Sequence, residues 1–282
     1  MAKDSVLRTG DALTDAVKAL TAVSETPRLD AELLLAFATR RTRSAVIAFH
    51  ERALDPAAAK LFSALLERRA RGEPLAYLTQ QREFFSLPLV VSPAVLIPRA
   101  ETELLVELTL AAIAPAARPA VLDVGTGSGA IALAIKRERG DALVTATDRS
   151  AAALAVARRN AAHLALDVRF VESDWLEKLG GEMFDVIASN PPYVRSAEIV
   201  GSLTFEPRVA LDGGADGLDA YRVLFAAARD HLNAGGALLV EHGAQQRAEL
   251  VALAAANGWP VAAAHDDLAG RPRVLELARG AP

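Results

Sequence analysis

The sequence predicts an α/β protein, and three observations along the chain support this fold class. Residues 1–73 show helical periodicity without strand patterns, whereas residues 74–98 are rich in β-forming residues. Residues 99–282 begin with a helical pattern and continue as a regular alternation of strands and helices. Such alternation is typical of a parallel sheet with right-handed crossovers. We therefore expect an N-terminal helical bundle, a linking β-hairpin and an α/β domain over these three ranges.

Four short helices are expected in the N-terminal range. Pro27 precedes the second of them, whose first turn carries acidic residues where the helix dipole favours them. Pro56 follows Asp55 at the start of the fourth helix, and Gly72 provides its stop. No residue here has the character of a catalytic group. The expected helices cover residues 11–24, 28–36, 44–50 and 56–71.

After the N-terminal range, the patterns of apolar residues predict the positions of the strands and helices. A hairpin is expected over residues 84–91, with Pro88 interpreted as its turn, and a helix is expected to reach about Ala114. Gly235 and Gly236 are interpreted as the stop before a strand. Strands are expected near residues 120–124, 143–147, 168–171, 184–189, 236–241, 261–266 and 273–278, and later helices near 128–138, 150–163, 217–232 and 244–257.

Composition excludes several functional classes. Of 282 residues, 52% are hydrophobic, which is typical of a globular protein, and the net charge of −4 argues against a general nucleic-acid binder. The chain has no cysteine, and its five histidines show no ligand spacing, so we expect no metal site. Residues 1–10 contain no apolar core of signal-peptide length, and the sequence contains no run of 18 apolar residues. We expect a soluble cytoplasmic protein that does not bind a membrane.

A glycine-rich loop after the strand at residues 120–124 predicts a nucleotide-type cofactor. The loop reads Gly125-Thr126-Gly127-Ser128-Gly129, and the next strand ends at Asp148. Glycines permit close approach of the backbone to a ligand, and an acid at that strand end can accept hydrogen bonds from ribose hydroxyls. The spacing G-x-G-x-G differs from the G-x-G-x-x-G of dinucleotide folds, which favours S-adenosylmethionine.

Two further residues near this loop leave alternatives open. Asp123 suits the amino-acid end of S-adenosylmethionine, but it equally suits a strand-end acid that caps the loop. Asp174 and Trp175 follow the third strand of the α/β domain, where an acceptor and an apolar wall can meet an adenine ring. Trp175 can instead be a core residue beneath the loop.

A stiff loop, Asn190-Pro191-Pro192-Tyr193, follows the apolar strand that ends near Ser189. Two prolines remove two backbone donors and fix φ twice, so the strand ends in a rigid extended turn. Ligands of open α/β sheets bind beyond the carboxyl ends of strands. An amide side chain and an aromatic ring on such a loop are suited to hold a planar polar group. Asn-Pro is also a common turn initiator, and that simpler interpretation stays open.

With these two loops and Asp148, the chain resembles class I S-adenosylmethionine-dependent methyltransferases. It is most similar to the N5-glutamine methyltransferases of peptide chain release factors, the HemK/PrmC family. The asparagine loop alone would fit N6-adenine methyltransferases as well, and other segments carry the distinction. These segments are residues 27–34, 72–78, 97–99, 101–103, 205–208, 213–218, 241–243 and 267–270.

The resemblance implies a fold, a reaction and a set of site residues. The fold is a helical N-terminal domain that contacts the release factor and a seven-stranded Rossmann-like methyltransferase sheet. The reaction is methyl transfer to the glutamine of the factor's Gly-Gly-Gln loop. The cofactor would contact Gly125 to Gly129, Asp148, Trp175 and Asn190. The substrate glutamine would lie on Asn190, Pro191, Pro192 and Tyr193, with Asn190, Pro191 and Tyr193 taking part in catalysis.

Two departures and three alternatives remain. Glutamine at residues 80–81 and Ala100 stand where the family often has glycine and proline, which affects the hairpin more than the chemistry. The nearest alternative is a DNA or RNA N6-adenine methyltransferase, disfavoured by the acidic balance of the catalytic part. An NAD-linked oxidoreductase is disfavoured by the glycine spacing, and a non-enzymatic binding module by the intact loops. The sequence assigns no role to Arg99 or Glu101.

Overall fold

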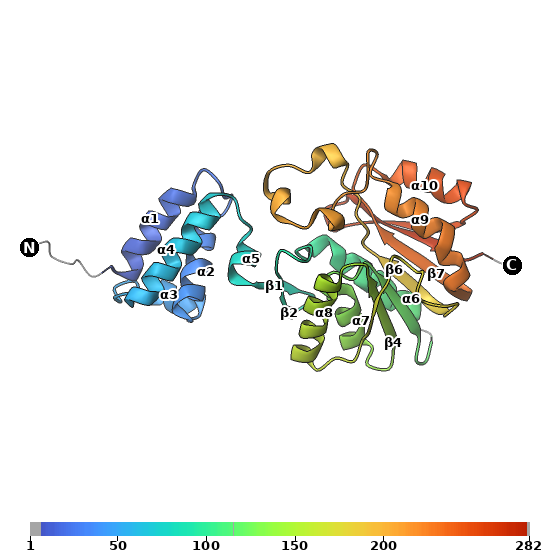
Figure 1. The fold of residues 1–282 in the computed structure, drawn as a ribbon, viewed down its shortest axis with the longest axis horizontal. Coiled ribbons are helices and arrows are strands. Elements are labelled where there is room, and N and C mark those ends of the chain that lie inside the picture. The colour runs from blue at the N-terminus through green and yellow to red at the C-terminus, as the bar shows by residue number, and fades with distance from the viewer. Residues whose placement is uncertain (1–6, 115, 281–282) are drawn as a thin grey trace, which may run out of the picture. The chain divides into compact units, whose positions relative to one another are not determined.

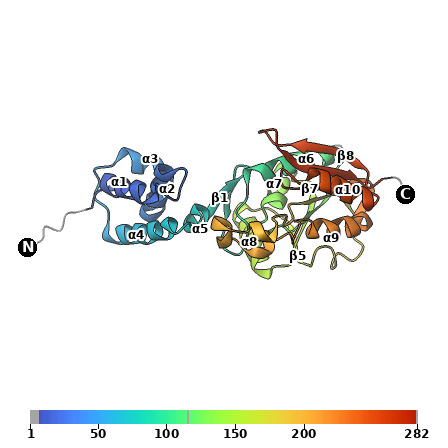
Figure 2. The ribbon, with the colours of Figure 1, turned by 90° about the horizontal axis from the view of Figure 1, so that it is seen from above.

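A computed structural model describes residues 7–114 and 116–280, and the chain divides into two compact units after Gln81 (Figures 1 and 2). The first unit contains a core of buried side chains, mainly leucine and alanine, from five helices. Asp30 and Arg69 form a mostly buried ion pair of 2.8 Å between the second and fourth of them. The helices are α1 (Thr9–Leu20), α2 (Pro27–Thr39), α3 (Arg43–Ala48), α4 (Pro56–Ala70) and the short α5 (Leu75–Thr79).

Helices α1 to α4 confirm the four helices predicted from periodicity, and the starts of α2 and α4 follow the predicted proline signals, whereas α1 ends at Leu20, before the predicted end at residue 24. Asp55 accepts hydrogen bonds from the backbone N–H groups of Ala57 and Ala58, which caps α4. Helix α5 is not predicted by the sequence pattern. It has only five residues, too few for a helical period to be recognised.

The β-hairpin consists of β1 (Gln81–Phe84) and β2 (Leu87–Val90). The prediction that Pro88 forms the turn is wrong, because Pro88 lies inside β2. The turn is made by Phe85 and Ser86, whose φ angles of 48° and 58° are left-handed. Left-handed residues match the twist of a two-residue hairpin turn, and a proline is tolerated in a strand with an open edge. Leu87, Leu89 and Phe84 pack into the core of the second unit.

The second unit is built on a seven-stranded sheet with the order β5-β4-β3-β6-β7-β9-β8. All seven predicted strands are present. Neighbouring pairs among β3 to β7 run parallel, whereas β9 runs antiparallel to β7 and β8. The strands are β3 (Ala120–Val124), β4 (Leu143–Asp148), β5 (Arg169–Glu172), β6 (Phe184–Ser189), β7 (Leu232–Glu241), β8 (Val261–Asp266) and β9 (Pro272–Ala278).

Helices cover both faces of this sheet (Figure 1). One apolar core contains side chains of α6, α7 and α8, and the other contains side chains of α9 and α10. None of the helices in the described ranges has the length and apolarity needed to cross a membrane. The helices are η1 (Ala100–Thr102), α6 (Glu103–Ile113), α7 (Ala130–Glu138), α8 (Ala151–Leu164), α9 (Asp219–Ala227), η5 (Ala228–His231) and α10 (Arg247–Ala256).

Strand β7 begins at Leu232, earlier than predicted. Gly235 and Gly236 lie inside the strand rather than before it, where the pairing with β6 shifts register between Phe184 and Val186. A Cβ atom on Gly236 would lie 2.9 Å from the carbonyl oxygen of Asp185. The glycine pair therefore permits a bulge and a close backbone approach, which the sequence cannot distinguish from a strand stop.

The connections between strands place a crevice at the middle of the sheet. Strand β3 lies between β4 and β6, so the direction of chain progression reverses beside β3. Such a reversal leaves a crevice at the carboxyl ends of the two central strands. A long segment after β6 borders this region and contains η2 (Ser196–Glu198), η3 (Gly201–Phe205) and η4 (Arg208–Ala210).

Candidate active site

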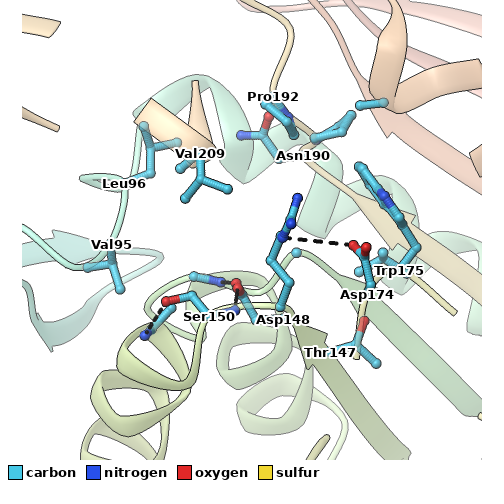
Figure 3. Close-up of a pocket in the computed structure, with 18 of the residues that line it drawn as sticks. Val95, Leu96, Thr147, Asp148, Ser150, Asp174, Trp175, Asn190, Pro192 and Val209 are labelled. Carbon is cyan, nitrogen blue, oxygen red and sulfur yellow. Dashed lines mark hydrogen bonds and ion pairs between the residues drawn. The ribbon is translucent and has the colours of Figure 1, made fainter. Parts of the chain in front are cut away.

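A cavity of about 320 Å³ lies at the carboxyl ends of β3, β4 and β6 (Figure 3). Its wall contains residues from both loops that the sequence singles out. Asp148 and Ser150 lie on one side of the cavity and Asn190 and Pro192 on the other. The predicted site residues in its wall are Gly125, Gly127, Asp148, Asp174, Trp175, Asn190, Pro191 and Pro192.

The glycine loop lines the cavity through two of its five residues. Gly125 and Gly127 have φ angles of 77° and 55°, and a Cβ atom on either would meet no atom within 4 Å. Glycine is needed at these two positions for the left-handed backbone, while the space beside them stays open to a ligand. Thr126 and Ser128 are buried instead. At Gly129, which also has a positive φ, an added Cβ would lie 3.1 Å from Leu133.

Asp148 is bound to the glycine loop. Its Oδ2 accepts a hydrogen bond of 2.9 Å from the N–H of Gly127, and its Oδ1 accepts one of 2.8 Å from the N–H of Ser150. Burial raises the pKa of Asp148 above its usual value, while these two N–H groups and Arg149 oppose the shift. A carboxylate has about four acceptor positions, so Asp148 can still accept from two ribose hydroxyls.

Asp123 is fully buried, and the structure supports its interpretation as a loop cap. Its Oδ2 accepts hydrogen bonds from the Thr126 hydroxyl at 2.6 Å and from the N–H of Ala132 at 3.1 Å. Burial raises the pKa of Asp123 to about 7. In the described chain Asp123 is not part of the cavity wall. Both hydrogen bonds join β3 to the loop and to α7, so Asp123 acts on the cavity through the shape of the loop.

Asp174 and Trp175 form the side of the cavity that follows β5. Trp175 lines the cavity and also packs against the core beneath it, so both interpretations of this residue describe part of its environment. The Asp174 carboxylate lies 3.9 Å from the Arg149 guanidinium, and both side chains are exposed. The sequence pattern does not mark Arg149 as a site residue, although it directly follows Asp148.

The asparagine loop presents Asn190 at the cavity wall in a defined orientation. The Ser189 hydroxyl donates a 2.7 Å hydrogen bond to the Val124 carbonyl, which ties the end of β6 to β3. Asn190 Nδ2 donates a 3.1 Å hydrogen bond to Thr102 Oγ1. Because the amide nitrogen is engaged by Thr102, the side-chain oxygen is the atom of Asn190 left to accept from a ligand.

Tyr193 differs from the rest of its loop, because it is not part of the cavity wall in the described chain. Its hydroxyl lies 3.4 Å from Glu241 Oε1, and its ring packs against the core that contains α9 and α10. Gln246 Nε2 donates to the Tyr193 carbonyl at 3.1 Å. Burial raises the pKa of Tyr193 far above its usual value, so the hydroxyl stays protonated. The structure thus places Tyr193 as an anchor of the loop.

Much of the cavity wall comes from segments that the sequence does not predict to contact a ligand. Val95 and Leu96 precede Arg99, and Val209 belongs to the segment after β6 (Figure 3). Apolar residues in such irregular segments carry no periodic signal that marks them as ligand contacts. The remaining unpredicted wall residues are Ala94, Val124, Thr147, Arg149, Ser150, Ala153, Ser173, Ala210, Asp212, Asp219, Ala220 and Val223.

Arg99 has a structural partner outside the cavity wall. It forms an ion pair with Glu206, which is mostly buried. Glu206 Oε2 also accepts a 3.0 Å hydrogen bond from the N–H of Ile97. Glu206 therefore holds the segment that carries Val95 and Leu96 against the segment that carries Val209.

Comparison with family models identifies two regions of the chain. Residues 11–79 match the PrmC N-terminal domain, and residues 99–206 match the methyltransferase small domain. The chain is 46% identical to a release factor glutamine methyltransferase of Salmonella typhimurium, over 89% of this chain and 92% of the relative. It is 49% identical to one of Xylella fastidiosa, over 88% and 91%.

Solved structures share the fold at lower identity. A methyltransferase from Pyrococcus furiosus has a TM-score of 0.52 and 21% identity, and the match covers 70% of this chain and 91% of that one. A 16S rRNA methyltransferase from T. thermophilus, in complex with AdoMet and guanosine, has a TM-score of 0.51 and 19% identity, covering 70% and 49%. At this identity the likeness concerns the fold alone.

Proposed function

The chain belongs to the family of release factor glutamine methyltransferases, and we propose that its cavity holds S-adenosylmethionine beside the side-chain amide of a release factor glutamine. The observation that carries this proposal is the orientation of Asn190. Its nitrogen donates to Thr102, so its oxygen is available to accept a hydrogen bond from a substrate N–H group. A side-chain amide of glutamine carries two such N–H groups.

The cavity wall fits S-adenosylmethionine at each part of that molecule. Gly125 and Gly127 have open space beside their α-carbons, which suits the amino-acid end. Asp148 offers free acceptor positions for ribose hydroxyls, and Trp175 offers an apolar face for adenine. When bound, the cofactor supplies a methyl group activated by a sulfonium.

The protein's own contribution is to hold and polarise the substrate nitrogen. An amide nitrogen is a weak nucleophile because its lone pair is delocalised into the carbonyl. In our proposal the Asn190 side-chain oxygen and the Pro191 carbonyl accept the two amide hydrogens. Acceptors aimed at these hydrogens stabilise the positive charge that develops on nitrogen during transfer. A strong base is not required, because the methylated nitrogen can lose its proton to water afterwards.

The rigidity of the loop supports this arrangement. Pro191 and Pro192 have no backbone donor, so no N–H group of these residues competes with the substrate for the two acceptors. A Cβ atom on Gly213 would lie 2.8 Å from the Pro192 carbonyl oxygen and 2.9 Å from the α-carbon of Tyr193. The backbone at Gly213 therefore packs directly against the asparagine loop and limits the movement of that loop.

We further propose that the N-terminal unit recognises the release factor and that the modified residue is the glutamine of its Gly-Gly-Gln loop. Exposed apolar side chains on this unit, including Phe37, Ile47 and Phe49, support a protein partner. No direct nucleic-acid contact forms part of the proposal. Because release factors take part in translation, we place the protein in the cytoplasm.

The test is incubation of the full chain with methyl-labelled S-adenosylmethionine and an unmethylated recombinant release factor. We expect label on the release factor, and fragmentation by mass spectrometry should place one added methyl group on the glutamine of the Gly-Gly-Gln loop. Parallel incubations with DNA and with RNA serve as controls. Label on nucleic acid, with none on the release factor, would overturn the proposal.

A further inference from the structure

The two ends of the glycine loop are held by different elements. At its start, the N–H groups of Gly125 and Thr126 each donate to the Thr147 carbonyl at 2.9 Å. At its end, Ser128 and Gly129 directly precede helix α7, which begins at residue 130. The backbone of this loop forms part of the cavity wall, so a fixed wall requires that both ends be held.

The Ser128 carbonyl needs a donor from outside α7. In a regular helix the N–H of residue 132 would donate to the carbonyl of residue 128. The Ala132 N–H donates instead to Asp123 Oδ2, at 3.1 Å. Ser128 is only 3% exposed, and a buried carbonyl without a donor costs free energy. A second element must therefore supply the hydrogen bond that the helix does not.

Asn160 on α8 supplies it. Its Nδ2 donates to the Ser128 carbonyl at 2.9 Å, and Asn160 is only 1% exposed. An added Cβ atom on Gly129 would lie 3.3 Å from the Cβ of Ala157, and Ala153 lines the cavity itself. Positions 153, 157 and 160 are four and three residues apart, so they share one face of the helix. This face of α8 packs along the glycine loop.

The same amide also binds β2, which lies beside α8 (Figure 1). Asn160 Oδ1 accepts from the Val90 N–H at 2.8 Å, and Nδ2 donates to the Val90 carbonyl at 3.0 Å. Opposite residues of antiparallel strands exchange the same two bonds, so this side chain takes the place of a neighbouring strand. Four residues after Val90 begins the wall segment of residues 94–96. Asn160 thus joins the glycine loop to the strand that leads to another part of the cavity wall.

The three contacts define the orientation of the Asn160 amide. The two ends of an asparagine amide have nearly the same shape, so rotation by half a turn exchanges them. The rotated amide would place its oxygen against the carbonyls of Val90 and Ser128, and its nitrogen against the Val90 N–H. All three hydrogen bonds would be lost. An amide at this position is therefore used for one acceptor and two donors together.

We propose that Asn160 is a positioning residue for S-adenosylmethionine, a role that rests on the proposed function. Ser128 lies between Gly127 and Gly129, whose φ angles of 55° and 85° are both left-handed. By holding the Ser128 carbonyl, Asn160 fixes this backbone and with it the open space beside Gly127. Among the described residues Asn160 is not part of the cavity wall, so its effect on the cofactor passes through the loop.

The test compares two variants of the full chain with a control on the same helix. Asn160→Leu keeps a side chain of similar size without the amide, and Asn160→Ala opens space that water can fill. The control is Ala155→Gly, which weakens α8 at an exposed position and leaves every contact of Asn160 in place. Thermal unfolding reports the stability of each protein.

Calorimetry then measures the Kd of S-adenosylmethionine. We expect both Asn160 variants to raise this Kd about tenfold or more, because a buried carbonyl of the loop loses its donor. Ala155→Gly should keep the wild-type Kd. With a release factor and saturating S-adenosylmethionine, kcat of the Asn160 variants should stay within about threefold of wild type, because the transfer step itself is unchanged.

Hydrogen exchange followed by mass spectrometry checks the loop directly, without cofactor. In both Asn160 variants the peptide that covers residues 125–129 should exchange faster than in wild type, while peptides from the middle of β3 and β4 keep their protection. In Ala155→Gly the loop peptide should exchange at the wild-type rate. This measurement does not depend on activity.

The outcomes separate the role of Asn160 from the proposed function. Wild-type Kd in both folded Asn160 variants would overturn the positioning role and leave the proposed function intact. An equal rise of Kd in Ala155→Gly would show that cofactor affinity follows the stability of α8, and failure of both Asn160 variants to fold would assign the residue to the fold; either result overturns the positioning role. Absence of S-adenosylmethionine binding to the wild type would overturn the proposed function itself.

Discussion

The two ends of the cavity are built in different ways. At the cofactor end, the carboxylates of Asp123 and Asp148 accept hydrogen bonds from the glycine loop, from helix α7 and from the N-cap residue of α8. At the substrate end, Asn190 depends on Thr102, 88 residues earlier, and Tyr193 on Glu241, 48 residues later. The carboxylate contacts of the cofactor end are therefore local in the sequence, whereas the substrate end is held by residues from distant parts of the chain.

This difference indicates that the two ends of the cavity have separate functions. The cofactor end shapes a loop by satisfying its backbone donors, so changes there should affect binding of S-adenosylmethionine and stability. The substrate end aims two acceptors, so changes there should affect the rate of transfer.

The largest effect is expected at Asn190. Asn190→Ala removes one of the two proposed acceptors, and kcat for release factor methylation should fall by about 100-fold or more, as for loss of one transition-state hydrogen bond. The Kd of S-adenosylmethionine, measured by calorimetry, should change little. A large loss of cofactor affinity would show that the two ends are not separate.

A smaller effect is expected at Asp148, and it should change cofactor affinity instead of the rate of methyl transfer. Asp148→Ala removes the proposed acceptor for ribose hydroxyls and the partner of the Gly127 N–H group. We expect the Kd of S-adenosylmethionine to rise by roughly 10-fold to 100-fold, the range for hydrogen bonds to a charged group. At saturating cofactor most of the transfer rate should return. Unchanged affinity in calorimetry would remove the ribose assignment.

The buried carboxyls predict a modest effect on stability that depends on pH. Burial raises the pKa of Asp123 from 3.8 to about 7, so between these pH values the folded state binds more protons than the unfolded state. Stability contributed by this group is therefore present at low pH and lost as pH rises toward 7. Relative to wild type, Asp123→Asn should gain on the order of 2 kcal/mol in unfolding free energy between pH 5 and pH 8.

Urea unfolding at the two pH values measures this gain. Glu241→Gln is the matched variant from the substrate end, because burial also raises the pKa of Glu241 to about 7. Both variants should shift stability in the same direction, but only Glu241→Gln should lower kcat at saturating cofactor, because Glu241 contacts Tyr193 of the asparagine loop. A loss of kcat in Asp123→Asn under these conditions would contradict the separation of the two ends.

The contrast also explains what the sequence could predict. Gly125, Gly127 and Asp148 are recognisable because a strand, a tight turn and the next strand end place them together through local geometry. Residues 190–193 are recognisable as a stiff loop for the same reason. Thr102 and Glu241 carry no such signal. Their contacts with Asn190 and Tyr193 depend on the register of β6 beside β7 and on the packing of η1.

Other differences have similar physical causes. The pattern cannot show that Phe85 and Ser86 adopt left-handed backbone, because neither is a residue that typically does so. Gly235 and Gly236 mark either a bulge or a strand end, and only the pairing with β6 decides. The burial of Tyr193 against α9 and α10 is likewise a result of tertiary packing.

The most direct test of whether the two ends of the cavity act separately is the double variant Asn190→Ala with Asp148→Ala. Cofactor Kd is measured by calorimetry, and the rate of a single turnover with a release factor is measured at saturating S-adenosylmethionine. If the two ends act separately, the double variant should show the Kd of Asp148→Ala and the transfer rate of Asn190→Ala, each within about a factor of two. A Kd much weaker than that of Asp148→Ala, or a rate far below that of Asn190→Ala, would show that the two ends of the cavity are coupled.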